Sequence, residues 1–342
     1  MDTLTKPISA PRRRTTADTV YPILLLVSVT HLLNDMMQSV IPAVYPLLKA
    51  KFGFSFAQIG LITLVFQMTS SILQPFVGRY ADRHPRPYSL AAGMCFTLAG
   101  LFALALAPGF APILLAVALI GWGSSIFHPE SSRVAQLASG GRKGLAQSIF
   151  QVGGNAGSAF GPLLAALVVI PYGQTSIMWF APAALLAIGI LLRIGNWYKR
   201  QLNAATAAPV TATAAAAELP RRKIRRALLI LTVLVFSKYF YIACMTNYFT
   251  FFLMDKFAFS VQDAQYSLFA FLAASAAGTV IGGPLGDRIG RKYVIWGSIL
   301  GAAPFALMLP YAGSGSAVAL AILVGLILSL IHISEPTRHA QI

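Results

Sequence analysis

The chain is short of charged residues, of acidic residues in particular, and of cysteine, and these shortages exclude several classes of protein. Asp, Glu, Lys and Arg make up only 11% of its 342 residues, against roughly 25% in a water-soluble domain. A hydrophobic fraction of 57% and a mean hydropathy of +0.71 exclude an ordinary soluble fold. Cys95 and Cys244 both fall in apolar runs, which predicts buried small hydrophobes rather than a disulfide framework.

Familiar catalytic motifs are absent as well. The sequence contains no H-E-x-x-H, G-x-S-x-G or C-x-x-C pattern and no G-x-x-x-x-G-K-[ST] phosphate loop. These absences argue against an intramembrane enzyme and against an ATP-driven pump. We therefore expect no catalytic residues, no cofactor and no metal.

What the chain has instead is a series of long apolar runs. A helix needs about 20 apolar residues to cross the ~30 Å hydrocarbon layer, where the backbone must satisfy its own hydrogen bonds. The sequence therefore predicts an all-α membrane protein of about ten helices, with the lipid bilayer as its surroundings. The expected spans are 20–47, 57–80, 88–107, 111–137, 144–170, 174–197, 227–254, 262–284, 293–311 and 317–327.

The net charge of +16 comes from basic residues that cluster in alternate loops. Lys and Arg gather in the N-terminal tail and around 79–86, 133–143, 193–226 and 288–292. They are absent from the loops near 108–112, 171–175 and 310–316. This alternation is the positive-inside pattern, which predicts a cytoplasmic N-terminus. Because the basic residues are spread over separate loops rather than gathered on one face, nucleic-acid binding is not expected.

The sequence repeats itself across two membrane halves. Shifting it by 205 residues lays 51–88 on 256–293 without a gap, so that KFGFS meets KFAFS. Such a repeat indicates a duplicated bundle with a substrate site between the halves. We expect a cytoplasmic tail at 1–19, a six-helix bundle at 20–198, a cytoplasmic linker at 199–226, a truncated second bundle of about four helices at 227–327 and a non-native tail at 328–342.

A charged loop motif occurs in both halves. The second copy is G-x-x-x-D-R-x-G-R-K, and the first keeps part of it in the same spacing, with Pro85 and Pro87 as departures. The residues concerned are Gly283, Asp287, Arg288, Gly290, Arg291 and Lys292, and Gly78, Asp82, Arg83 and Arg86. With this motif the chain resembles the major facilitator superfamily, whose signature loop joins helices two and three and recurs between eight and nine. The resemblance implies two six-helix bundles, the second of them truncated here.

The charged loops have two interpretations. A carboxylate at a helix end beside arginines can form charge-assisted bonds across a helix interface, and such a latch can hold one conformation and release in another. Alternatively, the arginines only fix the topology of the helices in the membrane.

Small residues recur every fourth position in the fifth span. Gly153, Gly157 and Gly161, followed by Pro162, allow close helix packing. GSAFGPLLAA at 157–166 also resembles the superfamily's antiporter motif, although two alanines replace its final glycines. The motif favours antiport over symport, and generic packing is the alternative. The opposite face of the same helix carries polar residues that could line a cavity, namely Gln147, Gln151, Asn155 and Ser158.

Ionisable residues within spans are costly and usually functional. In the first span His31, Asn34, Asp35 and Gln38 form one polar stripe. Asp35 lies near the bilayer middle and is the first candidate for a proton-binding carboxylate; a fixed hydrogen bond to a neighbouring helix is the alternative.

The fourth and seventh spans add further ionisable candidates. The fourth contains FHPESSR, in which His128 could relay protons, and Glu130 with Arg133 could form either a functional or a structural ion pair. Lys238 in the seventh span could meet an anionic substrate or could reach the cytoplasmic surface.

H-x-x-N-D in the first span and F-H-P-E in the fourth resemble the fosmidomycin-resistance branch of the superfamily. The resemblance implies a transporter driven by the proton gradient that exports small, anionic or phosphonate-like compounds such as antibiotics. We expect it to be a monomer in the bacterial cytoplasmic (inner) membrane. The alternatives are a proton-coupled uptake symporter and a non-transporting receptor of the same fold. The stripe around Asp35 argues against a receptor.

The last residues differ in character from the rest. LSLIHISEPTR within 328–342 resembles the translation of a transposase-type sequencing adapter, and a natural polar tail is the alternative. We expect the intact protein to continue into an eleventh and a twelfth helix.

Overall fold

The computed structural model describes residues 18–206 and 221–330, and the elements in these ranges are helices. The first bundle consists of α1 (Tyr21–Ala43), α2 (Tyr45–Phe52), α3 (Phe56–Gln67), the π-helical turn η1 (Met68–Ile72), α4 (Gln74–Arg83), α5 (Ser89–Leu106), α6 (Phe110–Leu137), α7 (Lys143–Leu164), the π-helical turn η2 (Ala165–Val169), α8 (Ile170–Tyr172), the 3₁₀ turn η3 (Gln174–Phe180) and α9 (Ala181–Thr206). The second consists of α10 (Arg221–Phe257), α11 (Val261–Ile289), α12 (Arg291–Met308), the 3₁₀ turn η4 (Leu309–Tyr311) and α13 (Ser314–Ser329).

The described helices match the expected all-α membrane architecture. Nine of them, some formed by consecutive elements, are long and apolar enough to cross a membrane, and α13 is a shorter apolar helix. The first expected span is broken at Val44, between α1 and α2, where Pro42 and Pro46 each remove a backbone donor. Cys95 and Cys244 are exposed on the helix surfaces, which corrects the prediction that they are buried.

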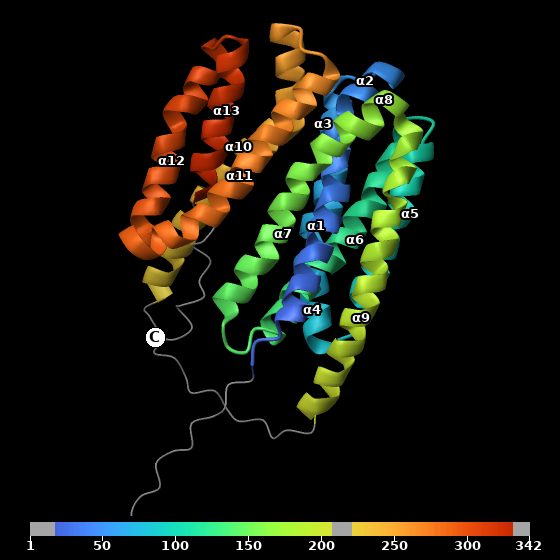
Figure 1. The fold of residues 1–342 in the computed structure, drawn as a ribbon, viewed down its shortest axis with the longest axis vertical. Helices are drawn as coiled ribbons and strands as arrows, with labels where there is room; N and C mark the ends of the chain where they lie inside the picture. The colour runs from blue at the N-terminus through green and yellow to red at the C-terminus, as the bar shows by residue number, and fades with distance from the viewer. Residues whose placement is uncertain (1–17, 207–220, 331–342) are drawn as a thin grey trace, which may run out of the picture.

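The two bundles lie side by side, with α10 to α13 on one side and α1 to α9 on the other (Figure 1). Helices reach into both ends of the predicted linker, because α9 continues to Thr206 and α10 begins at Arg221. The rest of that linker, the N-terminal tail and residues 331–342 lie outside the described residues.

The sequence repeat is visible in local structure. Ser55 caps α3 in a capping box with Gln58, and Ser260 caps α11 by accepting a hydrogen bond from the backbone N–H of Asp263. These serines occupy equivalent places in the repeat, at the turn that precedes the second helix of each bundle. The halves therefore share their helix-start signals as well as their pattern of apolar runs.

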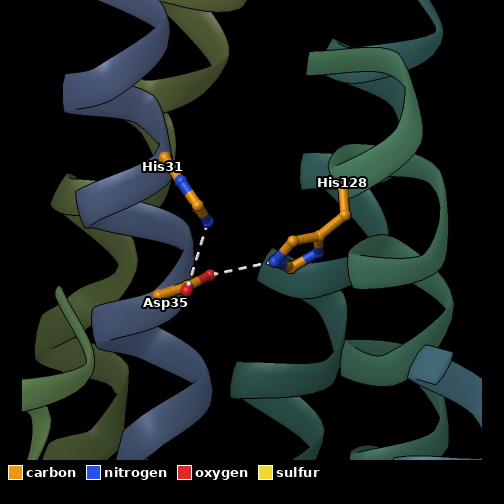
Figure 2. A group of neighbouring side chains, drawn as sticks. All are labelled: His31, Asp35 and His128. Atoms are coloured by element: carbon orange, nitrogen blue, oxygen red, sulfur yellow. Dashed lines mark ion pairs between the residues drawn. The ribbon is translucent and has the colours of Figure 1, made fainter. Parts of the chain in front are cut away.

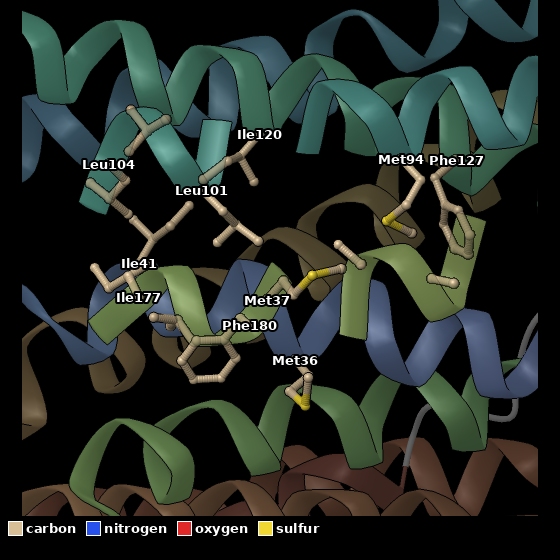
Figure 3. Packing of buried hydrophobic residues seen from close by; sticks show 14 of the residues in the cluster. Met36, Met37, Ile41, Met94, Leu101, Leu104, Ile120, Phe127, Ile177 and Phe180 are labelled. Atoms are coloured by element: carbon tan, nitrogen blue, oxygen red, sulfur yellow. The ribbon is translucent and has the colours of Figure 1, made fainter. Parts of the chain in front are cut away.

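Close packing of α1 against α7 organises the first bundle. A Cβ atom on Gly153 or Gly157 would lie about 2 Å from the carbonyl oxygens of Ser28 and Leu32, at 2.1 and 2.2 Å. Glycine is needed here because any side chain would push the two backbones apart. Around this contact Met37, Ile41, Leu101 and Phe180 build a continuous apolar core (Figure 3).

Three hydrogen bonds between described residues join the two bundles at one end of the molecule. Gln265 Nε2 donates to the carbonyl of Ala43 at 2.7 Å, and Gln262 Nε2 donates to that of Ala166 at 3.2 Å. Thr63 Oγ1 donates to Asn247 Oδ1 at 2.9 Å. We call this end, where α1 meets α2 and α10 meets α11, the closed end.

The opposite end carries most of the basic loops and is called the basic end. Here α4 and α9 finish and α7, α10 and α12 begin (Figure 1). Its described basic residues include Arg83, Arg142, Lys143, Lys199, Arg222 and Arg288.

Candidate functional site

Two adjoining cavities lie between the bundles. One has a volume of about 540 Å³ and the other about 680 Å³. Asp35 and Ser158 from the first bundle and Tyr239 and Leu272 from the second line both cavities. Of the described residues that line them, only His31 and His128 can carry a positive charge.

The wall of the larger cavity contains a cluster of His31, Asp35 and His128, of which Asp35 also lines the smaller cavity (Figure 2). His31 Nε2 lies 3.3 Å from one oxygen of the Asp35 carboxylate, and His128 Nε2 lies 3.4 Å from the other. His31 and Asp35 are one helical turn apart on α1, whereas His128 reaches them from α6. The structure thus joins the polar stripe of the first span to the F-H-P-E segment of the fourth.

Backbone carbonyls orient both histidine rings. His31 Nδ1 lies 2.8 Å from the carbonyl oxygen of Phe150 on α7, and His128 Nδ1 lies 3.1 Å from that of Ser124. A carbonyl oxygen can only accept, so Nδ1 of His31 must carry its proton, whereas Nδ1 of His128 can donate to the carbonyl of Ser124 or accept from the Ser124 hydroxyl, 3.2 Å away. The Nε2 atom of His31 therefore faces the carboxylate as the second ring nitrogen, which carries a proton only when that ring is charged.

The protonation of the histidine rings decides whether their contacts to Asp35 attract or repel. A neutral ring protonated on Nδ1 would point the lone pair of Nε2 at a carboxylate oxygen, and two acceptors repel each other. Each contact to Asp35 is therefore attractive only when a proton lies between the two groups. For His31 this proton is an added one, and its loss would weaken the contact to Asp35.

The surroundings of His31 leave it little freedom. Its side chain is only 2% exposed, and its ring stacks on Phe150 with the centroids 3.9 Å apart. A Cβ atom on Gly154 would lie 2.3 Å from the ring. His128 is more accessible, with 27% of its side chain exposed. Sequence reasoning missed Gly154 and Phe150, since only the register between α1 and α7 shows what they touch.

Other residues of the predicted stripes lie around this cluster. Asn34 Nδ2 donates to the Asp35 carboxylate at 3.0 Å, and Gln151 Nε2 donates to Asn155 Oδ1 at 3.1 Å. Gln38 lines the smaller cavity and Gln151 and Asn155 line the larger one. Gln38 Nε2 and Asn155 Nδ2 are buried without a hydrogen-bond partner among the described residues, which leaves donors for a bound molecule.

Arg133 and Glu130 lie away from the cavities, at the basic end. Arg133 donates to the carbonyl of Ala81 at 2.6 Å and pairs with the carboxylate of Asp82, both at the end of α4. Glu130 is 1% exposed, with its Oε1 3.5 Å from Nη1 of Arg133. Cations stabilise the C-terminal end of a helix, so this network fastens α6 to α4 within the first bundle. Neither side chain lines the two cavities, and the geometry is that of the structural ion pair, one of the two interpretations left open by the sequence.

The remaining residues of the two charged loop motifs do not join the cluster around Asp35. Arg86 donates to the hydroxyl of Tyr80 at 3.2 Å and lies over its ring, and Arg83 is exposed. In the second copy of the motif, which joins α11 to α12, Arg288 is exposed. The side chains of Asp287 and Arg291, and the surroundings of Gly283, lie outside the described residues.

Lys238 is buried, at 4% exposure, with its ammonium 5.6 Å from the ring of Tyr239. It lines neither cavity, and so the structure does not place it where it would touch a substrate in them. Its neighbour Tyr239, which the sequence analysis did not select, lines both.

The spacing of the histidine–aspartate cluster also bears on metals. The three possible ligand atoms lie within 4.8 Å of one another, and no other such group occurs in the described ranges. Structural zinc sites are closed by four ligands, whereas this group supplies three. Because protons alone satisfy both contacts to Asp35, the arrangement needs no metal, and the absence of one stays a prediction.

Comparison with known proteins identifies the family. A model of the major facilitator superfamily matches residues 27–337. The chain belongs to the major facilitator superfamily. It is 57% identical over 325 residues to the fosmidomycin resistance protein of Escherichia coli (strain K12), covering 95% of the chain and 80% of that protein. It is 43% identical to an uncharacterised transporter of the superfamily, YfnC, from Bacillus subtilis (strain 168), covering 94% of the chain and 80% of that protein.

Solved structures of the superfamily share the fold. A bacterial homologue of the human lysosomal transporter Spinster, in an inward-facing and unoccupied conformation, aligns with a TM-score of 0.71 at 17% identity, over 92% of the chain and 74% of that protein. A D-xylose–proton symporter aligns with a TM-score of 0.67 at 15% identity, over 93% of the chain and 81% of that protein. The predicted fold class and the resemblance to the fosmidomycin-resistance branch are confirmed. The protein is a multi-pass membrane transporter with the bilayer and a small molecule as its partners.

Proposed function

We propose that the protein exports small polar compounds of the fosmidomycin class across the bacterial cytoplasmic membrane in exchange for protons, acting as a monomer. Its relative in Escherichia coli is named for fosmidomycin resistance, and the identity of 57% supports a shared substrate class. The basic end would face the cytoplasm under the positive-inside rule, which also places the N-terminus there.

The observation that carries proton exchange is the geometry of the cluster around Asp35. In the proton-loaded state both carboxylate oxygens and both Nε2 atoms are engaged with one another, at 3.3 and 3.4 Å. Release of protons would free the same atoms to bind polar groups of a substrate in the adjoining cavities. Protons and substrate then compete for one set of atoms, which is the requirement for antiport.

A specific feature also supports proton-coupled uptake as a second candidate. With both histidines protonated, the cluster would carry one net positive charge, and it supplies the only cations among the described lining residues. An anionic substrate would then be attracted together with the protons, which is symport. The pairing of both imidazolium groups with Asp35 weighs against this, because the charge is already partly neutralised.

Flux measurements in proteoliposomes separate the candidates. Vesicles that contain the protein and are loaded with labelled fosmidomycin should lose the label faster when the outside is made acidic, since entering protons drive export. Under symport the same gradient would slow the loss, and a non-transporting receptor would leave it equal to that of protein-free vesicles. Either of the last two results would contradict the proposal.

A further inference from the structure

A chain of hydrogen bonds at the closed end connects the cavity to the contact between the bundles. Tyr45 of α2, Thr63 of α3 and Asn247 of α10 all line the 540 Å³ cavity. The Tyr45 hydroxyl lies 2.8 Å from Thr63 Oγ1, which in turn lies 2.9 Å from Asn247 Oδ1. This chain crosses from the first bundle to the second.

The distances indicate the direction of each bond in this chain. Asn247 Nδ2 donates to the carbonyl of Ala243 at 2.6 Å, which fixes the amide so that Oδ1 faces Thr63. Thr63 has one hydroxyl proton, and Asn247 Oδ1 at 2.9 Å is a nearer acceptor than the carbonyl of Ile59 at 3.3 Å. Thr63 therefore donates to Oδ1, and Tyr45 donates to Thr63. The crossing bond is therefore a neutral hydrogen bond with one donor and one acceptor.

The other crossing bonds at the closed end differ in one respect. Gln265 and Gln262 also reach across to backbone carbonyls, at Ala43 and Ala166, but neither glutamine lines a cavity. Of the three crossing bonds between described residues, the one from Thr63 to Asn247 is thus the one that a molecule in the cavity can reach. A neutral hydrogen bond contributes little net free energy, so a ligand bond can replace it.

We propose that Thr63 and Asn247 sense the substrate and couple its binding to opening of the closed end. A neutral substrate group with both a donor and an acceptor, such as a hydroxyl or an amide, would accept from Thr63 and donate to Asn247 Oδ1. Both side chains then keep a partner while the bond between the bundles is lost. The closed end retains only Gln265 and Gln262 of its three described crossing bonds and can separate. This inference rests on the proposed export of fosmidomycin-class compounds.

Distance measurements between spin labels test the coupling. Labels at Ala50→Cys and Asp255→Cys, which are exposed positions on opposite bundles near the closed end, report its separation. The background carries Cys95→Ser and Cys244→Ser, since both native cysteines are exposed. Addition of fosmidomycin should increase the population of long distances in this background.

Single substitutions distinguish the crossing bond that lines the cavity from the crossing bonds that do not. Thr63→Val, which keeps the shape of the side chain, should raise the long-distance population without ligand and abolish the further response to fosmidomycin, as should Asn247→Leu. Gln262→Leu removes a crossing bond outside the cavity, so it should raise the starting population and keep the response. If Asn247→Leu does not fold, Thr63→Val decides.

Two results would overturn the inference. If Thr63→Val retains the ligand-dependent change of the background, the crossing bond is not a sensor, although the proposed function stands. A background protein that does not respond to fosmidomycin, while the gradient-driven flux also fails, contradicts the proposed function and the sensor together.

Discussion

At the scale of single residues, the main finding is that two histidines from different helices share one carboxylate. His31 is held by stacking and by a backbone carbonyl, so its Nε2 remains directed at Asp35. His128 approaches the other oxygen from α6 and is more exposed. The three side chains therefore form one interacting group that joins α1 to α6.

The first prediction concerns the carboxylate of this cluster. Asp35→Asn should abolish the response of fosmidomycin flux to an imposed pH gradient, because an amide neither takes up a proton nor holds two imidazolium groups together. The flux is measured in proteoliposomes with the outside acidified. Asp255→Asn, which removes an exposed carboxylate near the closed end, serves as the matched control and should transport normally. Wild-type gradient dependence in Asp35→Asn would contradict the role given to the cluster.

Arg133, a candidate site residue from the sequence, instead joins two helices of the first bundle. Its guanidinium binds the end of α4 through Ala81 and Asp82 and lies beside the buried Glu130. Removing one member of a buried ion pair leaves an uncompensated charge, so the pair is best interpreted as a fastening of the first bundle. Whether this fastening also releases during transport stays a hypothesis.

At the scale of elements, the repeat places one backbone turn twice with different residues. Gly53 ends α2 with φ +68°, and Ala258, at the equivalent place after α10, has φ +54°. Glycine adopts this left-handed region freely, whereas a side chain is strained there. The second bundle therefore carries a local strain that the first avoids.

This difference predicts opposite effects for reciprocal substitutions. Gly53→Ala should lower the free energy of unfolding by about 1–2 kcal/mol, because alanine is strained in the left-handed region. Ala258→Gly should raise it by less than about 1 kcal/mol, since the freedom of glycine in the unfolded chain offsets part of the relief. Thermal unfolding in detergent measures both. Gly189→Ala on α9, where an added Cβ meets nothing within 4 Å, is the control for a glycine in a helical conformation and should raise the free energy of unfolding by about 0.5–1 kcal/mol. A stabilising Gly53→Ala would contradict the strain argument.

At the scale of the whole molecule, the two ends of the interface differ. Neutral hydrogen bonds join the bundles at the closed end, and the larger cavity extends toward the basic end through Pro129, Ser132 and Gln147. If the basic end faces the cytoplasm, this conformation faces inward. Alternating access then requires the closed end to open and the basic end to close.

Accessibility to a membrane-impermeant thiol reagent tests this orientation. In a background of Cys95→Ser and Cys244→Ser, Gln147→Cys should react faster in inside-out vesicles than in right-side-out vesicles, because its cavity would open to the cytoplasm. Ala50→Cys near the closed end should show the opposite preference. The reverse pattern for the pair would contradict the proposed topology.

Apolar run length and loop charge by themselves determined that this protein is an all-α membrane protein, because the bilayer leaves helices as the only solution for long apolar segments. The motifs in the loops and in the spans indicated the family. Helical periodicity placed His31 and Asp35 on one face of one helix. These inferences depend on local chemistry, which a linear pattern contains.

Only the tertiary structure decided which candidates meet. It joined His128 to Asp35, directed Arg133 to α4, kept Lys238 out of the cavities and revealed the crossing bond of Thr63 and Asn247. The physical reason is that contacts between helices depend on register and rotation, which the small residues of α1 and α7 set through distances of a few ångströms. Periodicity along one helix carries no information on which face of another helix it will touch.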